Sequence, residues 1–180
     1  MYCGCNPTAL SSQTQISDAL IRLMMKKAYS SITISELCRE SGISRQTFYS
    51  LFRSMENVIL FTLREKVCDL PDEAEASASL EQLCRCYSRY IRANRDLLKL
   101  LVENDIAWLV YNSIYESLLC CRKYAAESAE SVFPYAAHFL AGGLTGIVRQ
   151  YCAADTADTE VSAETLYDIL YGLVSGAYFR

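Results

Sequence analysis

Residues 32–49 read ITISELCRESGISRQTFY, and this stretch predicts two short helices separated by a turn. Thr33 and Glu36 form a capping box, in which each side chain bonds to the backbone amide of the other residue. Gly42 ends the first helix, because glycine adopts the left-handed conformation of a C-cap at little cost. Ser44 caps the second helix. Two short helices joined through a glycine turn are typical of a helix-turn-helix.

The outer face of the second helix carries side chains suited to DNA. Phe48 and Phe52 are four residues apart, so both can point into a small core and leave the polar residues outside. Arg45 can fork onto guanine or clamp a phosphate, Gln46 can pair with adenine, and Thr47 can contact a thymine methyl group or a phosphate. With the phosphate donors and the two helix caps, the candidate DNA contacts in this stretch are Thr33, Ser44, Arg45, Gln46, Thr47, Tyr49 and Ser50. The alternative is a polar face that is only solvated.

Helices are also predicted on both sides of this motif. Apolar residues recur at helical spacing over residues 16–24, and Ser54 caps a further helix that has an apolar stripe along one side. Residues 1–66 carry 8 Lys and Arg against 5 Asp and Glu, a net charge of +3. Residues 67–180 carry 9 Lys and Arg against 16 Asp and Glu, a net charge of −7. The two parts together give the net charge of −4 of the whole chain. A basic N-terminal part followed by an acidic C-terminal part favours a polyanion as the binding partner of residues 1–66.

The stretch from Ile32 to Tyr49 resembles the DNA-binding segment of TetR-family transcriptional regulators, most specifically in Thr47-Phe48-Tyr49 after Gly42-Ile43-Ser44. The resemblance covers residues 13–67 well and extends more loosely over the remainder through size and helix pattern. It implies an all-helical homodimer that binds a palindromic operator. Such a protein usually acts as a repressor, and it often leaves the DNA when a small ligand binds its C-terminal domain.

Several positions depart from the pattern of that family. Leu51 and Met55 stand where many members have a residue that contacts phosphate. Arg53 stands where many members have proline, and it is the candidate substitute for those lost contacts. These departures favour an alternative, a helical protein–protein adaptor with the same scaffold and weak or lost DNA binding.

The helix expected after Asp105 is apolar nearly all round, which places it centrally in its domain. One of its stripes is aromatic with polar tips, and such side chains suit a cavity with a few hydrogen-bonding groups. The candidate lining of an effector pocket is Tyr87, Trp108, Tyr111 and Tyr115. The alternative is that these rings simply pack in the core.

The last two helices, from about Pro134 to Cys152 and from about Ser162 to Tyr178, offer more apolar surface than one body of this size needs. A two-fold four-helix bundle with a second copy would bury that surface. Glycines in the first of these helices would let another backbone come close. The candidate dimer interface is Phe139, Gly143, Leu144, Ile147, Leu166, Ile169, Leu170, Leu173 and Val174.

The composition argues against several other classes of protein. The chain has 180 residues, 52% of them hydrophobic, which is too apolar for a disordered chain. No apolar run is long enough to span a bilayer, and Met1 to Leu10 show no secretory signal. A single histidine, His138, and the lack of a C-x-x-C motif leave no zinc spacing, and no nucleophile or phosphate-binding motif indicates an enzyme. Nine cysteines without a signal favour a reducing cytosol, with most of them buried as small hydrophobes and a thiol redox switch as the alternative.

The sequence therefore predicts an all-α protein with a three-helix helix-turn-helix domain in residues 1–66 and a helical ligand-binding and dimerisation domain in residues 67–180. The expected partners are an operator in double-stranded DNA, a second copy of the chain and an unidentified small-molecule effector. No cofactor, metal, membrane or catalytic site is expected, and the expected location is the cytoplasm.

Overall fold

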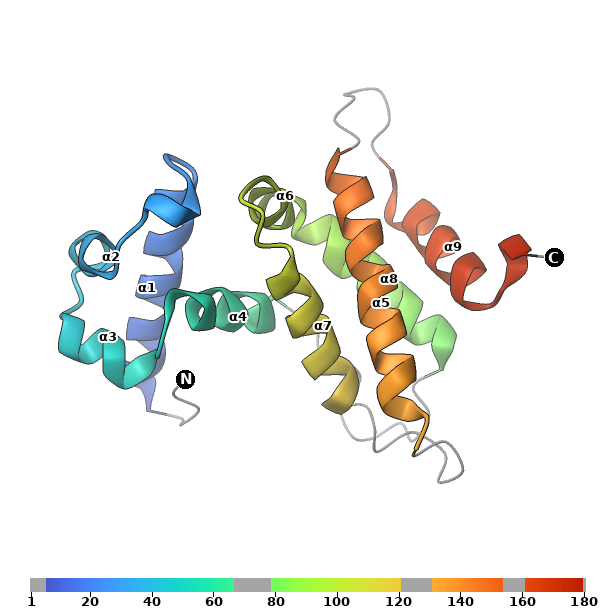
Figure 1. The fold of residues 1–180 in the computed structure, drawn as a ribbon, viewed down its shortest axis with the longest axis horizontal. Helices are drawn as coiled ribbons and strands as arrows, with labels where there is room; N and C mark the ends of the chain where they lie inside the picture. Colours follow the sequence, from blue (N-terminus) through green and yellow to red (C-terminus); the bar gives the residue numbers. More distant parts are fainter. Residues whose placement is uncertain (1–5, 67–78, 121–130, 154–160, 180) are drawn as a thin grey trace.

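The computed structural model describes residues 6–66, 79–120, 131–153 and 161–179, and every regular element within these ranges is helical. This confirms the predicted all-α fold. Figure 1 shows the order of the elements, which are α1 (Pro7–Met24), η1 (Tyr29–Ser31), α2 (Ile34–Ser41), α3 (Arg45–Leu51), α4 (Met55–Glu65), α5 (Leu80–Ala93), α6 (Arg95–Glu103), α7 (Trp108–Cys120), α8 (Phe133–Ala153), α9 (Ala163–Val174) and η4 (Ala177–Phe179).

The N-terminal unit consists of α1, α2 and α3, with α4 leading toward the body. Its helix starts follow the expected caps, since Thr33 Oγ1 accepts from the amide of Glu36 at 3.2 Å and Ser44 Oγ accepts from the amide of Thr47 at 3.1 Å. Gly42 has a φ of 70° and ends α2. Only half of the expected capping box is seen, because the carboxylate of Glu36 pairs with Lys27 Nζ at 2.5 Å.

The first helix begins at Pro7, nine residues before the apolar stripe that predicted it. Asn6 caps this helix, and its Oδ1 accepts from the amide of Thr8 at 3.0 Å. Proline suits the first helical position because its fixed φ is helical and its missing amide hydrogen would have no partner there. The pair Asn6-Pro7 was therefore a local start signal that apolar periodicity alone did not reveal.

The C-terminal body is built from α5 to α9. The helix α8 packs on α7 and α6, and α9 packs on α5, while α4 reaches across from the N-terminal unit to pack on α7 (Figure 1). Its core includes side chains that are almost fully buried, namely Leu98, Leu101, Leu109, Val148, Leu166 and Leu170. No helix in the described part of the chain combines the length and apolarity needed to cross a bilayer.

The final helix is shorter than its apolar pattern predicted. It ends at Val174, and Gly176 turns the chain with a φ of 77° into a short 3-10 helix. The ring of Tyr178 then folds back onto α9, where a Cβ on Gly172 would lie only 2.6 Å from it. The expectation that Tyr178 continues the helix is wrong, because the glycine makes a left-handed turn that a helix cannot contain.

Candidate nucleic-acid interface

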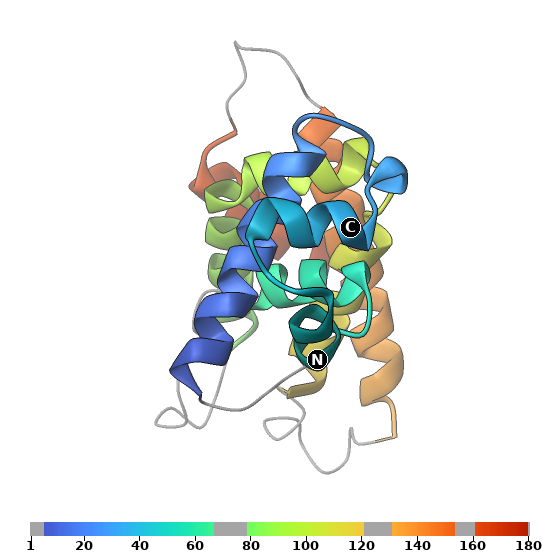
Figure 2. The same cartoon turned by 90° about the vertical axis from the view of Figure 1, so that its left-hand side faces the viewer.

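The helix α3 has a buried face and an exposed face. Phe48 and Leu51 are 0% and 5% exposed, so they anchor the helix in the core of the N-terminal unit. Arg45, Gln46 and Tyr49 are exposed on the other side, with Tyr49 at 50%. Figure 2 shows α2 and α3 at the end of the molecule that faces the viewer, and α9 lies at the opposite end in Figure 1. This exposed face is therefore free of contact with the body.

A row of aromatic rings holds α3 in place. The ring centroids of Phe48 and Phe52 are 6.1 Å apart, and those of Phe52 and Phe61 are 5.7 Å apart, which links α3 to α4. Cys38 on α2 is buried near this corner, and burial raises the pKa of its thiol. A small side chain lets α2 and α3 approach closely, so the orientation of α3 is set by packing.

Two ion pairs join α1 and the turn that follows it to α2 of the helix-turn-helix. Lys27 pairs with Glu36, and its ammonium group lowers the pKa of that carboxyl through the hydrogen bond. Arg22 pairs with Glu40 at 3.4 Å. Both pairs are partly exposed, so they add little stability, but they occupy these two cations. Exposed arginines that these two pairs do not use include Arg39 on α2, Arg45 on α3 and Arg53 just after α3.

The structure leaves every candidate DNA contact accessible. The exposed residues are Thr33, Ser44, Arg45, Gln46, Tyr49, Ser50 and Arg53, and Thr47 is half-buried beside its cap. Two hydroxyl groups have internal partners, because Ser44 Oγ and Thr47 Oγ1 are 2.9 Å apart and Ser50 Oγ donates to Thr47 O at 2.7 Å. These groups shape the start of α3, while Arg45, Gln46 and Tyr49 extend from it.

Leu51 and Met55 behave as the sequence pattern suggested. Leu51 is 5% exposed and Met55 is half-buried, and both belong to the core of the N-terminal unit. Neither side chain can donate to a phosphate. The start of α4 therefore contributes less to a DNA surface than α3 does.

The structure separates the four aromatic residues expected to line a pocket. Tyr87 is buried at 6% exposure, whereas Trp108 is 48% exposed at the start of α7. Tyr111 and Tyr115 instead stack with His138 on α8, and the rings of Tyr115 and His138 have centroids 4.2 Å apart. Tyr111 Oη also hydrogen-bonds to His138 Nδ1. These rings form a surface stack between α7 and α8, because the inward side of α7 is taken by aliphatic residues.

The candidate dimer residues divide into two groups. Leu144, Leu166 and Leu170 are 7%, 2% and 1% exposed, so they belong to the core of their own protomer and are removed from the interface. Apolar residues at helical spacing indicate that a helix face is buried. They do not indicate whether the helix that covers this face belongs to the same chain or to a second copy. The residues that remain accessible are Phe139, Gly143, Ile147, Ile169, Leu173 and Val174, and Phe139 is 78% exposed.

Two contacts that sequence reasoning missed fix the N-terminal unit to the body. The amide of Tyr29 donates to Asn104 Oδ1 at 2.7 Å, and Arg64 on α4 pairs with Glu116 on α7. Their partners are 75 and 52 residues apart, so no local pattern links them. They fix the position of the helix-turn-helix unit, and with it α3, relative to the body.

Comparisons with known proteins agree with this geometry. Residues 16–60 match the family model described as bacterial regulatory proteins, tetR family. The chain is 25% identical over 164 residues to the HTH-type transcriptional regulator BetI of Rhizobium meliloti (strain 1021), which covers 91% of this chain and 74% of that protein.

Two solved structures share the fold. The crystal structure of Lin0861 from Listeria innocua superimposes with a TM-score of 0.76 and 14% identity over 100% of this chain and 97% of that one. The structure of the dihydroxyacetone kinase operon activator DhaS superimposes with a TM-score of 0.52 and 19% sequence identity. The match covers 92% of this chain and 95% of that one. At these identities the likeness concerns the fold alone. The helix-turn-helix geometry and the family model that matches residues 16–60 together support a DNA-binding segment like that of the tetR family of bacterial regulatory proteins.

Proposed function

We propose that this regulator binds a palindromic DNA operator as a homodimer and represses transcription until a small ligand releases it. The observation that supports this best is the exposed polar face of α3 on a helix whose other face is anchored by Phe48 and Leu51. Arg45 and Gln46 have the donors and acceptors that distinguish base pairs in the major groove. Two such helices from a symmetric dimer would read half-sites about 34–36 Å apart.

The outer face of α8 supports the dimer. Phe139 and Tyr135 are 78% and 76% exposed on this face, which is unusual for large apolar rings of a lone protein. A Cβ added at Gly142, Gly143 or Gly146 would meet no atom within 4 Å in the protomer. Glycine weakens a helix interior, so three glycines that internal packing does not require favour close approach of another helix.

Release by a ligand requires that the ligand bind one conformation better than another. The two units meet through the packing of α4 on α7 and through few polar contacts, so their relative angle can change at modest cost. A change in that angle alters the separation of the two reading helices in a dimer. Such a change lowers the affinity for an operator of fixed spacing.

The test uses DNA from upstream of the gene of this protein, in gel-retardation titrations at several salt concentrations. Arg45→Ala is expected to cost about 1–3 kcal/mol of binding if the side chain reads a base. Arg89→Ala is the matched control, because Arg89 is an exposed arginine on α5 in the body. Equal retardation of the wild type and the Arg45 variant would remove the proposed role of α3.

An adaptor without DNA binding is the second candidate, and the burial of Leu51 favours it. A family position for a phosphate contact is occupied here by a core side chain, so the attraction to the DNA backbone is reduced. The same titration at low salt separates the two candidates. Complete lack of retardation by the folded protein would select the adaptor.

A further inference from the structure

The main helix packing between the N-terminal unit and the body is that of α4 on α7. The helix α4 also packs on α1, and the ion pair between Arg64 and Glu116 lies within the contact of α4 with α7. Both side chains of this pair are nearly half exposed, so the pair adds little rigidity. Packing along one helix pair fixes the distance between two bodies better than their rotation about the contact. A tie away from α4 and α7 is therefore needed to set that rotation.

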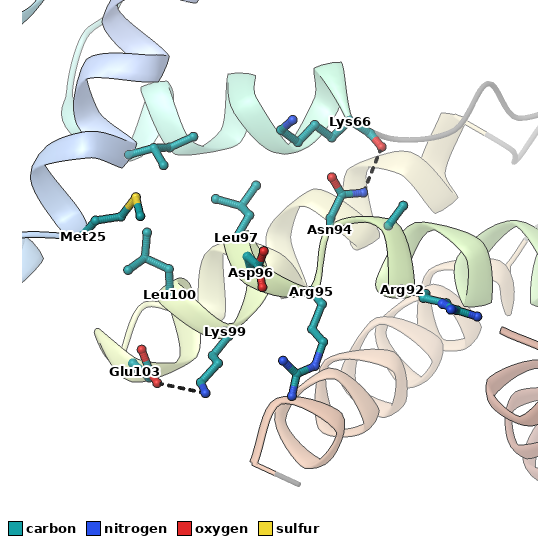
Figure 3. Close-up of a pocket in the computed structure, with 12 residues that line it drawn as sticks. Met25, Lys66, Arg92, Asn94, Arg95, Asp96, Leu97, Lys99, Leu100 and Glu103 are labelled. Carbon is teal, nitrogen blue, oxygen red and sulfur yellow. Dashed lines mark hydrogen bonds and ion pairs between the residues drawn. The ribbon is translucent and has the colours of Figure 1, made fainter. Parts of the chain in front are cut away.

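An open cavity separates the two units beside this contact. Its volume is about 570 Å³, and its lining includes Met25 just after α1, Lys66 just after α4 and Leu100 on α6. Figure 3 shows the side chain of Met25 beside that of Leu100, at the edge of the space between the two units. Met25 is 74% exposed, so the end of α1 is not packed tightly onto α6. Helix packing on this side therefore leaves the angle between the units unset.

Two polar ties cross this gap, one at each end of α6. At the start of α6, Asn94 Nδ2 donates to Lys66 O at 3.5 Å, which is the long limit of a hydrogen bond (Figure 3). At the end of α6, Asn104 Oδ1 accepts from the amide of Tyr29 at 2.7 Å, and this bond is partly buried. Asn104 Nδ2 donates to Leu100 O, which holds the side chain on α6. The tie at Asn104 is therefore the stronger of the two.

The tie at Asn104 has leverage over α3. Tyr29 follows the end of α1, and Figure 1 and Figure 2 both place α3 toward the start of that helix. Since α1 has 18 residues, it is about 27 Å long, and a rotation of about 10° about its end moves its start by about 5 Å. One base-pair step of DNA is about 3.4 Å. A small change of angle at Asn104 therefore moves α3 by more than one base pair.

We propose that Asn104 is a positioning residue for operator recognition: its bond to Tyr29 sets the rotation of the helix-turn-helix unit, and thereby the spacing of the half-sites that a dimer accepts. This inference rests on the proposed function, because a spacing is defined only where two reading helices meet one operator. Arg45 and Gln46 read bases within each half-site, whereas Asn104 acts from the body and selects the distance between the half-sites.

A palindromic duplex that the full-length wild type enriches from a random-sequence pool provides the probe. The duplex is rebuilt with its centre lengthened or shortened by one and by two base pairs, and gel retardation measures the affinity for each spacing. The wild type is expected to bind the best spacing at least about tenfold more tightly than spacings two base pairs away. Asn104→Leu is expected to reduce this ratio to about threefold or less, because the rotation is no longer set.

Two further variants separate positioning from an effect on folding alone. Asn104→Asp keeps an oxygen acceptor for the Tyr29 amide and should restore most of the spacing preference. Asn112→Leu replaces another half-buried asparagine of the body, on α7, and should leave the preference unchanged. A side chain that only stabilises the fold would change the affinity for every spacing by the same factor. The spacing ratio of the wild type in Asn104→Leu would overturn the proposal.

A measurement without DNA separates the tie from the proposed function. Amino acids that carry a ketone replace Thr8 at the start of α1 and Arg89 on α5, and they bear the spin labels because nine cysteines preclude thiol labelling. Dilution with unlabelled chain restricts the measured distances to those within one chain. The distribution of the distance between the two labels is expected to be at least about twofold wider in Asn104→Leu than in the wild type, and narrow again in Asn104→Asp.

The two measurements fail in different ways. Equal widths of the distance distribution in the wild type and in Asn104→Leu would overturn the proposal. A distribution that Asn104→Leu widens, in a protein that enriches no duplex, would support the tie and contradict the proposed function.

Discussion

The backbone amide of Tyr29 donates a 2.7 Å hydrogen bond to Asn104 Oδ1, and it joins the turn before α2 to the end of α6. Asn104 also donates through Nδ2 to Leu100 O at 2.9 Å, so both polar atoms of its side-chain amide have a hydrogen-bond partner. This residue therefore sets where the helix-turn-helix unit stands relative to the body.

Asn104→Leu is expected to lower the free energy of unfolding by about 1–2 kcal/mol, because it leaves the partly buried Tyr29 amide without its acceptor. Asn104→Asp keeps an oxygen at the same place and should protect that amide better. Denaturant unfolding gives the stability, and hydrogen exchange at the Tyr29 amide reports the bond itself. Equal exchange rates in the Leu and Asp variants would show that the bond does not hold the turn.

The side chain of Tyr29 predicts a loss of stability in alkaline solution. Burial, and then the nearby charge of Glu56, raises the pKa of its hydroxyl from 10.0 to about 12. Between these values the unfolded chain has lost the proton while the folded chain keeps it, so stability is complete below pH 10 and falls as the pH rises toward 12. The ring of Tyr29 is only partly buried, so solvent screens part of this effect and the loss from this group is at most about 2 kcal/mol.

Tyr29→Phe should remove that part of the alkaline loss, which is seen as the difference between the two unfolding curves at pH 8 and pH 11. The carboxylate of Glu56 lies close enough to the hydroxyl to raise its pKa, but the two groups make no hydrogen bond of normal geometry, so removal of the hydroxyl should cost about 1 kcal/mol or less at pH 7. Parallel pH profiles for the two proteins would contradict the argument.

A buried pair of hydroxyl groups fastens α1 to α4. Ser17 Oγ and Thr62 Oγ1 are 2.6 Å apart, and Thr62 Oγ1 donates to Val58 O at 2.9 Å, which makes Ser17 the donor within the pair. Ser17→Ala leaves Thr62 its bond to Val58, so a loss of about 1 kcal/mol is expected. Thr62→Val should cost more, because Ser17 then keeps a buried donor without this acceptor.

The wild type, Ser17→Ala, Thr62→Val and the double variant together form a double-mutant cycle that measures the coupling of this pair. The coupling energy is expected to be about 0.5–1.5 kcal/mol and favourable, as for hydrogen-bonded neighbours. Chemical denaturation of the four proteins measures it. Additive losses would show that the two hydroxyl groups contribute independently.

Local signals predicted the parts of the fold that depend on a few neighbouring residues. The caps Thr33, Ser44, Ser54 and Ser162 were all expected, and each accepts from the amide three residues later. Such a bond needs only the right side chain at the start of a helix, so the sequence is enough to find it. The exposed face of α3 followed from the same local spacing.

Features that depend on distant neighbours could not be found in this way. Leu144 and Leu170 have the spacing of a dimer face, yet their partners are helices of the same protomer. Trp108 belongs to an apolar helix, but it emerges on the surface because the body covers other sides of α7. The Tyr29 to Asn104 bond also depends on how two units dock, and periodicity within one helix carries no information on that.

The glycines of α8 provide a test of the dimer that separates it from the stability of one chain. In a lone protomer, Gly143→Ala should raise stability by about 0.5–1 kcal/mol, since alanine favours a helix and its Cβ would meet no atom within 4 Å. In a dimer closed through this face, the added methyl group pushes two helices apart.

A larger side chain at the same position tests the dimer directly. Gly143→Leu should convert a dimer to monomers in sedimentation equilibrium, while Arg89→Leu on α5 should leave the dimer intact. The unfolding temperature of a dimer also rises with protein concentration, and Gly143→Leu should remove this dependence. A wild type that sediments as a monomer, or a Gly143→Leu variant that remains a dimer, would place the partner copy on another face.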